Sequence, residues 1–373
     1  MKYIQVYTLL LVLICHISCG GQNQTGQAKI NTQPIEKKID SIRLKYTSGV
    51  RSILEDSKGN TWFGSHNEGV CLLHNGELQY FTTENGLSNN QVRSIYEDKN
   101  GIIWFECGIG LSRYDGKEMT VYYERNYDSK NGWKLTDGDL WFKGDETVGY
   151  NKLEGNPGLY QYDGKKLYYR TFPIKPKSGE ENAYSISTPF VKSKTGMVWF
   201  GTYRVLIGYD GKQFKMFNND SLRLDTTEHL HIRCIMEDSK GNIWFGNNSG
   251  GNPTGGIGVL KYDASGDAGA EFTHFTKQHR LRKEDTKGNS LDRVFSIGED
   301  TLGNIWFGTV ESGVWRYDAS AAAGHTMKNF IKKDGLDGDI TWIIYKSKSG
   351  ELWFGGGPNG VYRFNGKSFE RKY

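Results

Sequence analysis

Four residues in the middle of the sequence have the types and the spacing that acid–base chemistry requires. Glu228, His229 and His231 lie within four consecutive positions, and His279 lies in a later polar stretch. A carboxylate and two or more imidazoles can take up and release protons, and they can also bind a metal ion. Because histidines in long loops are commonly just solvated, the alternative is that this group has no chemical role. These four residues are the candidate catalytic site of an alternative, enzymatic function.

A second set of residues is suited to binding rather than to reaction. It occupies one column of a recurring V-x-S-I-x-E segment, at the position after the first residue: Arg51, Arg93, Lys130, Thr188, Arg233, Phe295 and Trp342. Basic groups bind carboxylate, sulfate or phosphate, and aromatic rings pack against sugars or other rings. All members except Thr188 are therefore predicted to bind an anionic small ligand, such as an acidic sugar. The alternative is that the arginines pair with acids of the same segments, such as Glu55 and Glu97.

No further motif for catalysis, metal binding or cofactor binding occurs in the sequence. It lacks G-x-x-x-x-G-K-[ST], H-E-x-x-H and G-x-S-x-G. The glycine-rich stretch 251–256 precedes an expected strand rather than a helix, so it lacks the context of a phosphate-binding loop. Asp56 and Asp238 lie in D-S-K-G-N tracts, where turn formation explains them without calcium. We predict no cofactor, no metal site, and a binding protein rather than an enzyme.

The candidate residues recur because the chain itself repeats. A similar segment ends in a Trp-Phe pair seven times, at Trp62, Trp104, Trp141, Trp199, Trp244, Trp306 and Trp353. Each copy is interpreted as four strands joined by tight Asp- and Gly-containing turns. Four-stranded units that recur about every 40 to 50 residues are typical of propeller blades. We predict an all-β fold, a seven-bladed β-propeller of four-stranded antiparallel blades, in which the repeated Trp packs between blades.

The repeat also resembles a known family. The segment from Gly86 to Phe105, G-L-S-N-N-Q-V-R-S-I-Y-E-D-K-N-G-I-I-W-F, is similar to the two-component regulator propeller repeat, and the resemblance extends over residues 50–367. That family occurs in the periplasmic sensor half of bacterial hybrid histidine kinases, so the resemblance implies a propeller fold and ligand sensing. Family receptors continue into a transmembrane helix, a kinase and a DNA-binding domain. None of these is expected here, and kinase activity is not implied.

Three details of the predicted ring concern its irregular parts. The third copy, from Ser129 to Trp141, lacks the Glu-Asp pair of the other copies, which leaves its register open. The outer strand of the last blade comes either from residues 369–372 or from residues 42–46. The longest loop insertions, at 144–158 and 247–256, are expected on the face that carries the channel mouth, where a propeller scaffold gathers its binding residues.

The N-terminus is predicted to be a targeting segment and a tether. Residues 1–18 combine a basic start with a short apolar run, as a secretory signal does. Ser18-Cys19-Gly20 resembles the bacterial lipobox, which implies lipidation of Cys19 and anchoring in the membrane. Ordinary secretion is the alternative. Residues 19–40 are polar and are interpreted as a flexible tether, and 41–373 as the propeller domain.

Composition excludes several other classes. The 373 residues include 48 Gly, only 7 Pro and 50 aromatic residues, a mixture that argues against a disordered chain. The net charge of +4 gives no strong basic field, so we predict no nucleic-acid partner. The three cysteines beyond the tether, Cys71, Cys107 and Cys234, form no metal or disulfide pattern and are expected to be buried thiols.

These observations lead to one predicted function and two alternatives. We expect a non-enzymatic ligand-binding or sensory accessory protein of the cell envelope, with its ligand or a protein partner at the loop-rich channel mouth. One alternative is a propeller lyase or hydrolase that uses the His/Glu group, since the streptogramin lyases are seven-bladed propellers with similar repeats. The other is a platform for an envelope protein, which an exposed aromatic patch on the loop-rich face would favour.

Overall fold

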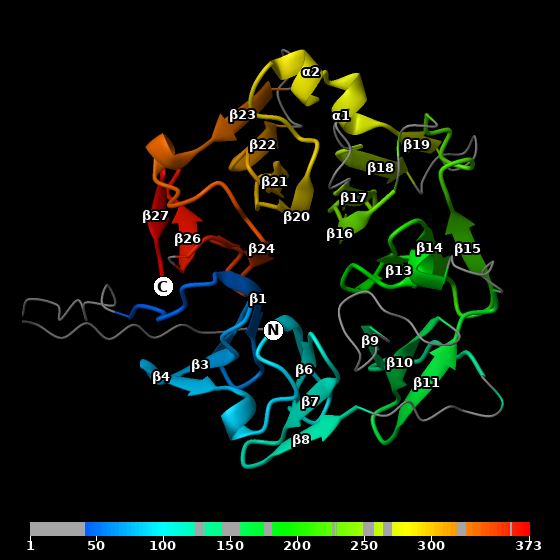
Figure 1. Ribbon diagram of the computed structural model, residues 1–373, viewed down its shortest axis with the longest axis vertical. Helices are drawn as coiled ribbons and strands as arrows, with labels where there is room; N and C mark the ends of the chain where they lie inside the picture. The colour runs from blue at the N-terminus through cyan, green and yellow to red at the C-terminus, as the bar shows by residue number, and fades with distance from the viewer. Residues whose placement is uncertain are drawn as a thin grey trace, which may run out of the picture. The chain divides into compact units, whose positions relative to one another are not determined.

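Seven antiparallel sheets surround a central axis in the compact unit that spans Asp40–Tyr373 (Figure 1). The computed structural model describes residues 42–123, 130, 132–143, 157–174, 181–225, 228, 230–248, 257–263, 271–318, 326–358 and 360–373. The predicted seven-bladed β-propeller is confirmed. The predicted signal peptide, Cys19 and the tether lie outside the described residues. No helix in the described part of the chain is long and apolar enough to cross a membrane.

Each sheet is one blade, and its strands follow one another in sequence order from the channel outward. Blades one to three contain β1 (Val50–Glu55), β2 (Thr61–Ser65), β3 (Val70–His74) and β4 (Glu77–Phe81); β5 (Val92–Glu97), β6 (Ile103–Cys107), β7 (Leu111–Tyr114) and β8 (Met119–Tyr122); and β9 (Leu140–Lys143), β10 (Gly158–Tyr162) and β11 (Leu167–Thr171). Blades four and five contain β12 (Val191–Lys192), β13 (Val198–Gly201), β14 (Leu206–Tyr209) and β15 (Phe214–Phe217); and β16 (Ile232–Glu237), β17 (Ile243–Asn247), β18 (Val259–Asp263) and β19 (Glu271–Thr273). Blades six and seven contain β20 (Val294–Glu299), β21 (Ile305–Thr309), β22 (Val314–Asp318) and β23 (Thr326–Phe330); and β24 (Ile343–Lys346), β25 (Leu352–Gly355), β26 (Val361–Phe364) and β27 (Phe369–Arg371).

Short helical segments lie in the connections between blades. The helices α1 (Phe275–Gln278) and α2 (Lys283–Thr286) connect blade five to blade six. Single 3₁₀ turns precede blades two, four and seven, at Thr83–Asn85, Glu181–Tyr184 and Lys332–Asp334.

The turn between the first two strands of a blade is built on one carboxylate. Oδ1 of Asp56 accepts the backbone N–H groups of Lys58 and Asn60, both at 2.9 Å, while Oδ2 accepts the indole N–H of Trp62 at 2.9 Å. The same indole bond is made to Asp98, Asp238 and Asp300 in blades two, five and six. The Asp of the repeat therefore fixes both the turn and the packing Trp, which confirms the interpretation of these residues as turn formers.

The repeated Trp packs between blades, as predicted. Ring centroids of Trp62 and Phe105, in the second strands of blades one and two, lie 5.6 Å apart, and those of Trp104 and Phe142, in blades two and three, lie 5.3 Å apart. Equivalent pairs join blades three to four, five to six and six to seven. All three predicted buried thiols are also found as free, buried cysteines.

The first strands of neighbouring blades approach each other closely. The second strand of a blade must therefore carry Gly where it faces them. The hydroxyl of Ser52 donates to the carbonyl of Val92 in blade two at 3.2 Å. A Cβ on Gly64 would lie 2.2 Å from Oγ of Ser52 and 2.7 Å from Cγ1 of Val92. The Gly of the I-W-F-G motif is thus required by the strand of the following blade.

Six blades have the predicted four strands, and blade three has fewer among its described residues. Its described residues form three strands, with β9 nearest the channel. At the Gly position of the motif, blade two carries Glu106 and blade three carries Lys143. Nζ of Lys143 lies 3.2 Å from Oε1 of Glu106, and both side chains are buried. These two blades thus carry a buried ion pair where the other five blades carry Gly.

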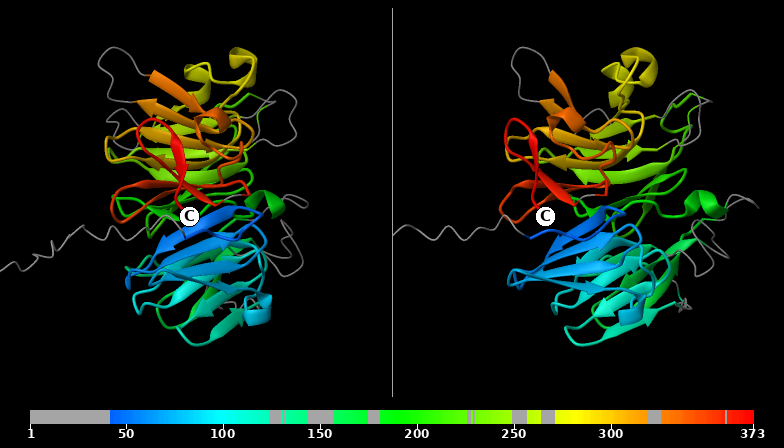
Figure 2. Two further views of the ribbon diagram at one scale, coloured as in Figure 1. Left: turned by 90° about the vertical axis from the view of Figure 1, so that its left-hand side faces the viewer. Right: turned by 60° about the vertical axis from the view of Figure 1, so that its left-hand side comes forward.

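The C-terminal residues complete the last blade. β27 pairs with β26, and the backbone N–H of Val361 donates to the carbonyl of Tyr373 at 3.1 Å. Residues 42–46 form no strand, although Leu44 and Tyr46 are buried in the core shared by blades one and seven. Of the two sequence alternatives, the C-terminal one is therefore confirmed. In side view the last sheet lies next to the first blade (Figure 2), and β1 contacts β24 directly.

Candidate functional site

A cavity of about 260 Å³ lies in the channel between the first strands of the blades. Five of the six predicted ligand-binding residues line it, and we call them the collar: Arg51, Arg93, Arg233, Phe295 and Trp342. Lys130 does not line this cavity. Thr188, the polar member of the same column, is buried and accepts the N–H of Gly201 at 2.8 Å. The column recognised in the sequence is therefore brought together at one site, except in blades three and four.

Four collar residues lie on β-bulges. In blades one, two, five and six the pairing of the first two strands skips one residue, and the residues at the skip are Arg51, Arg93, Arg233 and Phe295. A bulge leaves the extra residue out of the hydrogen-bonded ladder and turns its side chain away from the regular alternation. The second residue of these strands lines the channel cavity, while the first, such as Val50, is fully buried.

Aromatic rings lie next to two guanidinium groups of the collar. Cζ of Arg51 lies 5.6 Å from the ring centroid of Trp342, and Cζ of Arg233 lies 5.3 Å from that of Phe295 and 5.7 Å from that of Tyr203. Cations at such distances are attracted by the ring face. Phe295 and Trp342 are themselves in edge-to-face contact, with centroids 5.1 Å apart. From blade four to blade one, the order is thus a ring, a cation, two rings in contact, and a second cation.

Two histidines extend this arrangement. Nη1 of Arg51 contacts Nδ1 of His66 at 3.2 Å, and the His66 ring stacks on Trp342 with an interplanar angle of 5°. Burial, and then the charge of Arg51, hold the pKa of His66 below its usual value. The His231 ring lies 4.3 Å from that of Tyr203, and burial, followed by Arg233, lowers the pKa of His231 to about 3. Both imidazoles are therefore neutral at pH 7.

Lys143 supplies the basic group of blade three that was predicted at Lys130. Its side chain lines the cavity and pairs with Glu106, whose Oε2 also accepts the N–H of Lys143 at 2.9 Å. Four cations thus face the cavity, and no Asp or Glu is among the described residues that line it. Sequence reasoning missed Lys143, Tyr203 and His66. The signal for Lys143 was available, since it replaces the Gly of the repeat.

Below the collar the channel wall is apolar. The fourth residue of the V-x-S-I-x-E strand lines the same cavity in five blades: Ile53, Ile95, Ile235, Ile297 and Ile344. These side chains are 5–8% exposed. An unpaired charge beside these apolar side chains would be costly, so a charged ligand in the cavity would need the cations of the collar as partners.

The acids of the same strands are engaged at the opposite end. Glu97 accepts the N–H and the hydroxyl of Ser57 at 2.7 and 2.5 Å, and Oε2 of Glu55 accepts the N–H of Lys348 at 2.5 Å. Glu55 lies four residues beyond Arg51, a distance of roughly 13 Å along an extended strand. These carboxylates connect the turns of neighbouring blades, and the alternative that they neutralise the collar arginines gains no support from the bonds they make.

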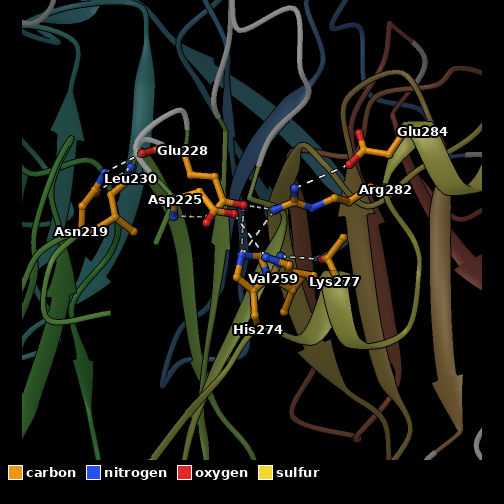
Figure 3. A network of polar contacts seen from close by, with 10 residues as sticks. Asn219, Asp225, Glu228, Leu230, Val259, His274, Lys277, Arg282 and Glu284 are labelled. Atoms are coloured by element: carbon orange, nitrogen blue, oxygen red, sulfur yellow. Dashed lines mark hydrogen bonds and ion pairs between the residues drawn. The ribbon is translucent and has the colours of Figure 1, made fainter. Parts of the chain in front are cut away.

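Glu228, one of the candidate catalytic residues, lies in a network of polar contacts that includes Arg282 and His274 (Figure 3). Oε1 of Glu228 bonds to Arg282 and lies 3.6 Å from Nε2 of His274, while Oε2 accepts the N–H of Asp225 at 2.9 Å. Burial alone would raise the pKa of Glu228, but the bonds from Arg282 and Asp225 lower it overall. Glu228 is thus a buried, paired carboxylate in the connection between blades.

His231 and His279 do not join this group. The N–H of His231 donates to Oδ1 of Asn247, and its ring lies against Tyr203. His279 packs on Phe275, with centroids 4.3 Å apart, and lines a different pocket of about 330 Å³. His229 lies outside the described residues. No group of three or more His, Cys, Asp or Glu side chains suited to a metal ion occurs among the residues that the structure describes.

The ring of blades around a basic channel mouth defines a seven-bladed β-propeller with a polar pocket on its axis. Three segments, residues 47–67, 86–105 and 228–249, match the family model described as two component regulator propeller. They span the first two strands of blades one, two and five. The chain is a propeller of the two-component regulator type, as the resemblance of its repeats implied.

Solved structures share this fold at low sequence identity. The extracellular domain of the hybrid two component system BT3049 from B. thetaiotaomicron is 19% identical, with a TM-score of 0.58, over 84% of this chain and 38% of that one. This chain therefore spans well under half of that domain. A streptogramin B lyase is 13% identical (TM-score 0.54, 86% and 94% covered), and YCF48 from Cyanidioschyzon merolae is 12% identical (0.54, 86% and 96%). These likenesses show the fold alone. No curated protein matches the sequence.

Proposed function

We propose that the chain is a ligand-binding propeller of the cell envelope, sensory or accessory in role and not catalytic, which holds a small anionic or sugar-like molecule at the collar. The observation that carries the proposal is the convergence of Arg51, Arg93, Arg233, Phe295 and Trp342 on one cavity. Pockets that bind small molecules combine an apolar lining with a few converging polar groups, and this cavity has both. Its volume places the ligand, or the part of it that enters, at the small end of the usual range.

Two further points support the envelope location and the sensory role. Two-component regulator repeats match the chain in three segments, and one solved structure with the same fold is described as an extracellular domain. A signal peptide at 1–18 with lipidation of Cys19 would anchor the propeller by its N-terminus, with 19–40 as the tether. A protein partner at the channel mouth is compatible with the same location.

A lyase or hydrolase has weaker support. Glu228 is paired with Arg282, and His279 lies in another pocket, so two of the candidate residues are not placed to act on one substrate. The fold shared with the streptogramin B lyase does not by itself transfer a reaction.

The test is a binding screen on the propeller and two matched triple variants. In the first, Arg51, Arg93 and Arg233 become Ala. In the second, three exposed lysines of the turns between third and fourth strands become Ala: Lys117, Lys212 and Lys367. Both variants lose three positive charges, but only the first loses them at the collar. Acidic sugars, inorganic anions and neutral sugars are screened by thermal shift, and hits are measured by calorimetry. Binding that the collar variant loses and the control keeps supports the proposal. Binding that is equal in both overturns it.

A further inference from the structure

Blades one and seven are neighbours in space but not in sequence. Every other pair of adjacent blades is joined by a connecting segment of the chain, whereas β1–β4 and β24–β27 each come from one continuous stretch and, among the described residues, share no strand. Side-chain and backbone contacts therefore close the ring at this boundary, which we call the seam. At the turn end of the seam, Oε2 of Glu55 accepts the N–H of Lys348 at 2.5 Å, and the N–H of Glu55 donates to the hydroxyl of Tyr345 at 3.0 Å.

Residues 42–48, which precede β1, also lie in the seam, and we call them the clasp. Leu44 and Tyr46 are each 4% exposed and belong to the core shared by blades one and seven. The hydroxyl of Tyr46 donates to the carbonyl of Phe63 in blade one at 3.0 Å. Nη2 of Arg371, in the last strand of blade seven, donates to the carbonyl of Leu44 at 3.2 Å. The clasp is thus bonded to both blades.

One carboxylate fixes the end of the clasp that leads into the first strand. Glu68, in the loop between β2 and β3, accepts the N–H groups of Thr47 and Ser48 at 2.9 and 2.7 Å and their hydroxyls at 3.0 and 2.5 Å. Burial acts to raise the pKa of Glu68, but the bonds from Ser48 and Thr47 lower it overall. Arg51 follows Ser48 after two residues, so the clasp continues directly into the strand that carries a collar arginine.

The seam also divides the collar. Trp342 immediately precedes β24 of blade seven, whereas Arg51 and His66, which contact its ring, belong to blade one. The centroid of the Trp342 ring lies 5.6 Å from Cζ of Arg51 and 5.6 Å from the centroid of the His66 ring. Beside β1, a Cβ on Gly49 would lie 2.5 Å from the carbonyl oxygen of Gly357 in blade seven. Movement of the two blades apart would break these contacts together.

We propose that the clasp holds blades one and seven together at the channel mouth and that ligand binding at the collar depends on it, because Arg51 and Trp342 lie on the two sides of the seam. The inference rests on the proposed function and concerns the regulation of its site. The residues that precede the clasp are those interpreted as the tether, so attachment through the N-terminus acts on the segment that closes the collar. By reciprocity, a ligand held by both blades stabilises the clasp.

The first experiment compares two deletions of the same size in the full chain. Leu44→Ala removes a buried side chain of the clasp, and Leu222→Ala, the control, removes one that is packed in the core of blades four and five. The pKa of His66, measured by NMR titration, reports on the seam, because burial and then Arg51 hold it below its usual value in the closed ring. We expect both variants to lower the melting temperature, and only Leu44→Ala to raise the pKa of His66 toward about 6.5. An unchanged pKa of His66 in Leu44→Ala would overturn the proposal.

The second experiment measures the affinity of the parent and both variants for sulfate and for glucuronate by calorimetry. We expect Leu44→Ala to bind about tenfold more weakly than the parent, within the usual range of coupling between sites, and Leu222→Ala to bind as the parent does. Equal affinities in all three proteins would overturn the dependence of binding on the clasp. Should Leu44→Ala fail to fold, Tyr46→Phe, which loses only the hydroxyl that bonds to the clasp's neighbouring carbonyls, takes its place. A parent that binds neither these probes nor any compound of the screen would instead remove the proposed function, and the titration of His66 would still decide whether the clasp closes the seam.

Discussion

The ammonium group of Lys143 and the carboxylate of Glu106 lie 3.2 Å apart in the part of the ring where blade three has no described inner strand. Both residues stand where five other blades carry Gly. In those blades the inner strands leave no room for a Cβ, as Gly64 and Gly246 show. The buried ion pair therefore occupies the place in the channel wall that Gly occupies in those blades.

Loss of the Glu106 charge is expected to destabilise the propeller strongly. Glu106→Gln keeps the volume but leaves the buried ammonium of Lys143 without the carboxylate at 3.2 Å, and such changes cost roughly 3 kcal/mol or more. Urea unfolding followed by tryptophan fluorescence measures this. The double variant Glu106→Gln/Lys143→Met is expected to recover most of the loss. A single variant as stable as the parent would show that the pair contributes nothing to folding.

The Gly of the repeat should tolerate no side chain in blade five. A Cβ on Gly246 would lie 2.5 Å from Sγ of Cys234 and 2.8 Å from Cγ1 of Val294. Gly246→Ala is therefore expected to lower the free energy of unfolding by about 1–3 kcal/mol, the usual effect of overpacking. Gly132→Ala is the control, since a Cβ there meets nothing within 4 Å. Equal unfolding midpoints for the two variants would contradict the close approach.

The carboxylates of the turns should make the stability of the folded protein depend on pH. Burial acts to raise the pKa of Asp56, but the bonds from Trp62 and Asn60 lower it overall. The charged form therefore contributes stability that is present above the unfolded pKa, about 4, and that is lost as the pH falls through the lower folded value. Asp56→Asn presents an amide to the donors of Asn60 and Trp62 and is expected to cost about 1–3 kcal/mol at pH 7. Thermal melts should show this gap shrinking below about pH 4, and a gap that stays constant would disprove the linkage.

Anion binding at the collar should strengthen as the pH falls. The pKa of His66 is lowered by burial and then by Arg51, so the free protein holds this imidazole neutral at pH 7. A bound anion raises that pKa, and protonation is then coupled to binding in the pH range below about 6.5. Sulfate is the suitable probe because its own charge does not change there. His66→Gln is expected to flatten the dependence between about pH 7.5 and 5.5, and an unaltered slope in this variant would exclude His66 as its source.

The buried Arg282 should matter for folding and not for ligand binding. It pairs with Glu228, and both side chains are largely buried, at 14% and 8% exposure. Arg282→Ala leaves Glu228 buried without its main partner, at an expected cost of about 3 kcal/mol. The control is Arg280→Ala, which removes a side chain that is 85% exposed and should change the free energy of unfolding little. Sulfate affinity is expected to be the same in both variants, and a selective loss in Arg282→Ala would place this network in the binding site.

The sequence was sufficient for the ring and for most of the collar because both repeat. The seven Trp-Phe pairs set the number of blades, and the column from Arg51 to Trp342 follows once the first strand is aligned. Blade three was the exception for the same reason. Its first strand lacks the Glu-Asp pair, so alignment placed Lys130 in the column, whereas the cation that lines the cavity is Lys143.

What the sequence could not supply was contact between residues that do not repeat. Tyr203 lies beside Arg233, and His66 lies beside Arg51. Both contacts depend on the course of the loops that carry Tyr203 and His66, which the repeat does not determine. Glu228 and His279 have the types expected of a catalytic group, but their partners, Arg282 and Phe275, come from the short helical connection to blade six. Such pairings depend on tertiary structure that residue spacing does not encode.

The bulge in the first strand has a consequence for how propellers of this kind could diversify. Because Arg51, Arg93, Arg233 and Phe295 stand outside the hydrogen-bonded ladder, their identity is decoupled from the hairpin that holds each blade together. One codon per blade can then be exchanged with little effect on the register of the sheet. The residues at the channel mouth can therefore be exchanged one blade at a time. A change in ligand preference then requires no change in the fold of the blades.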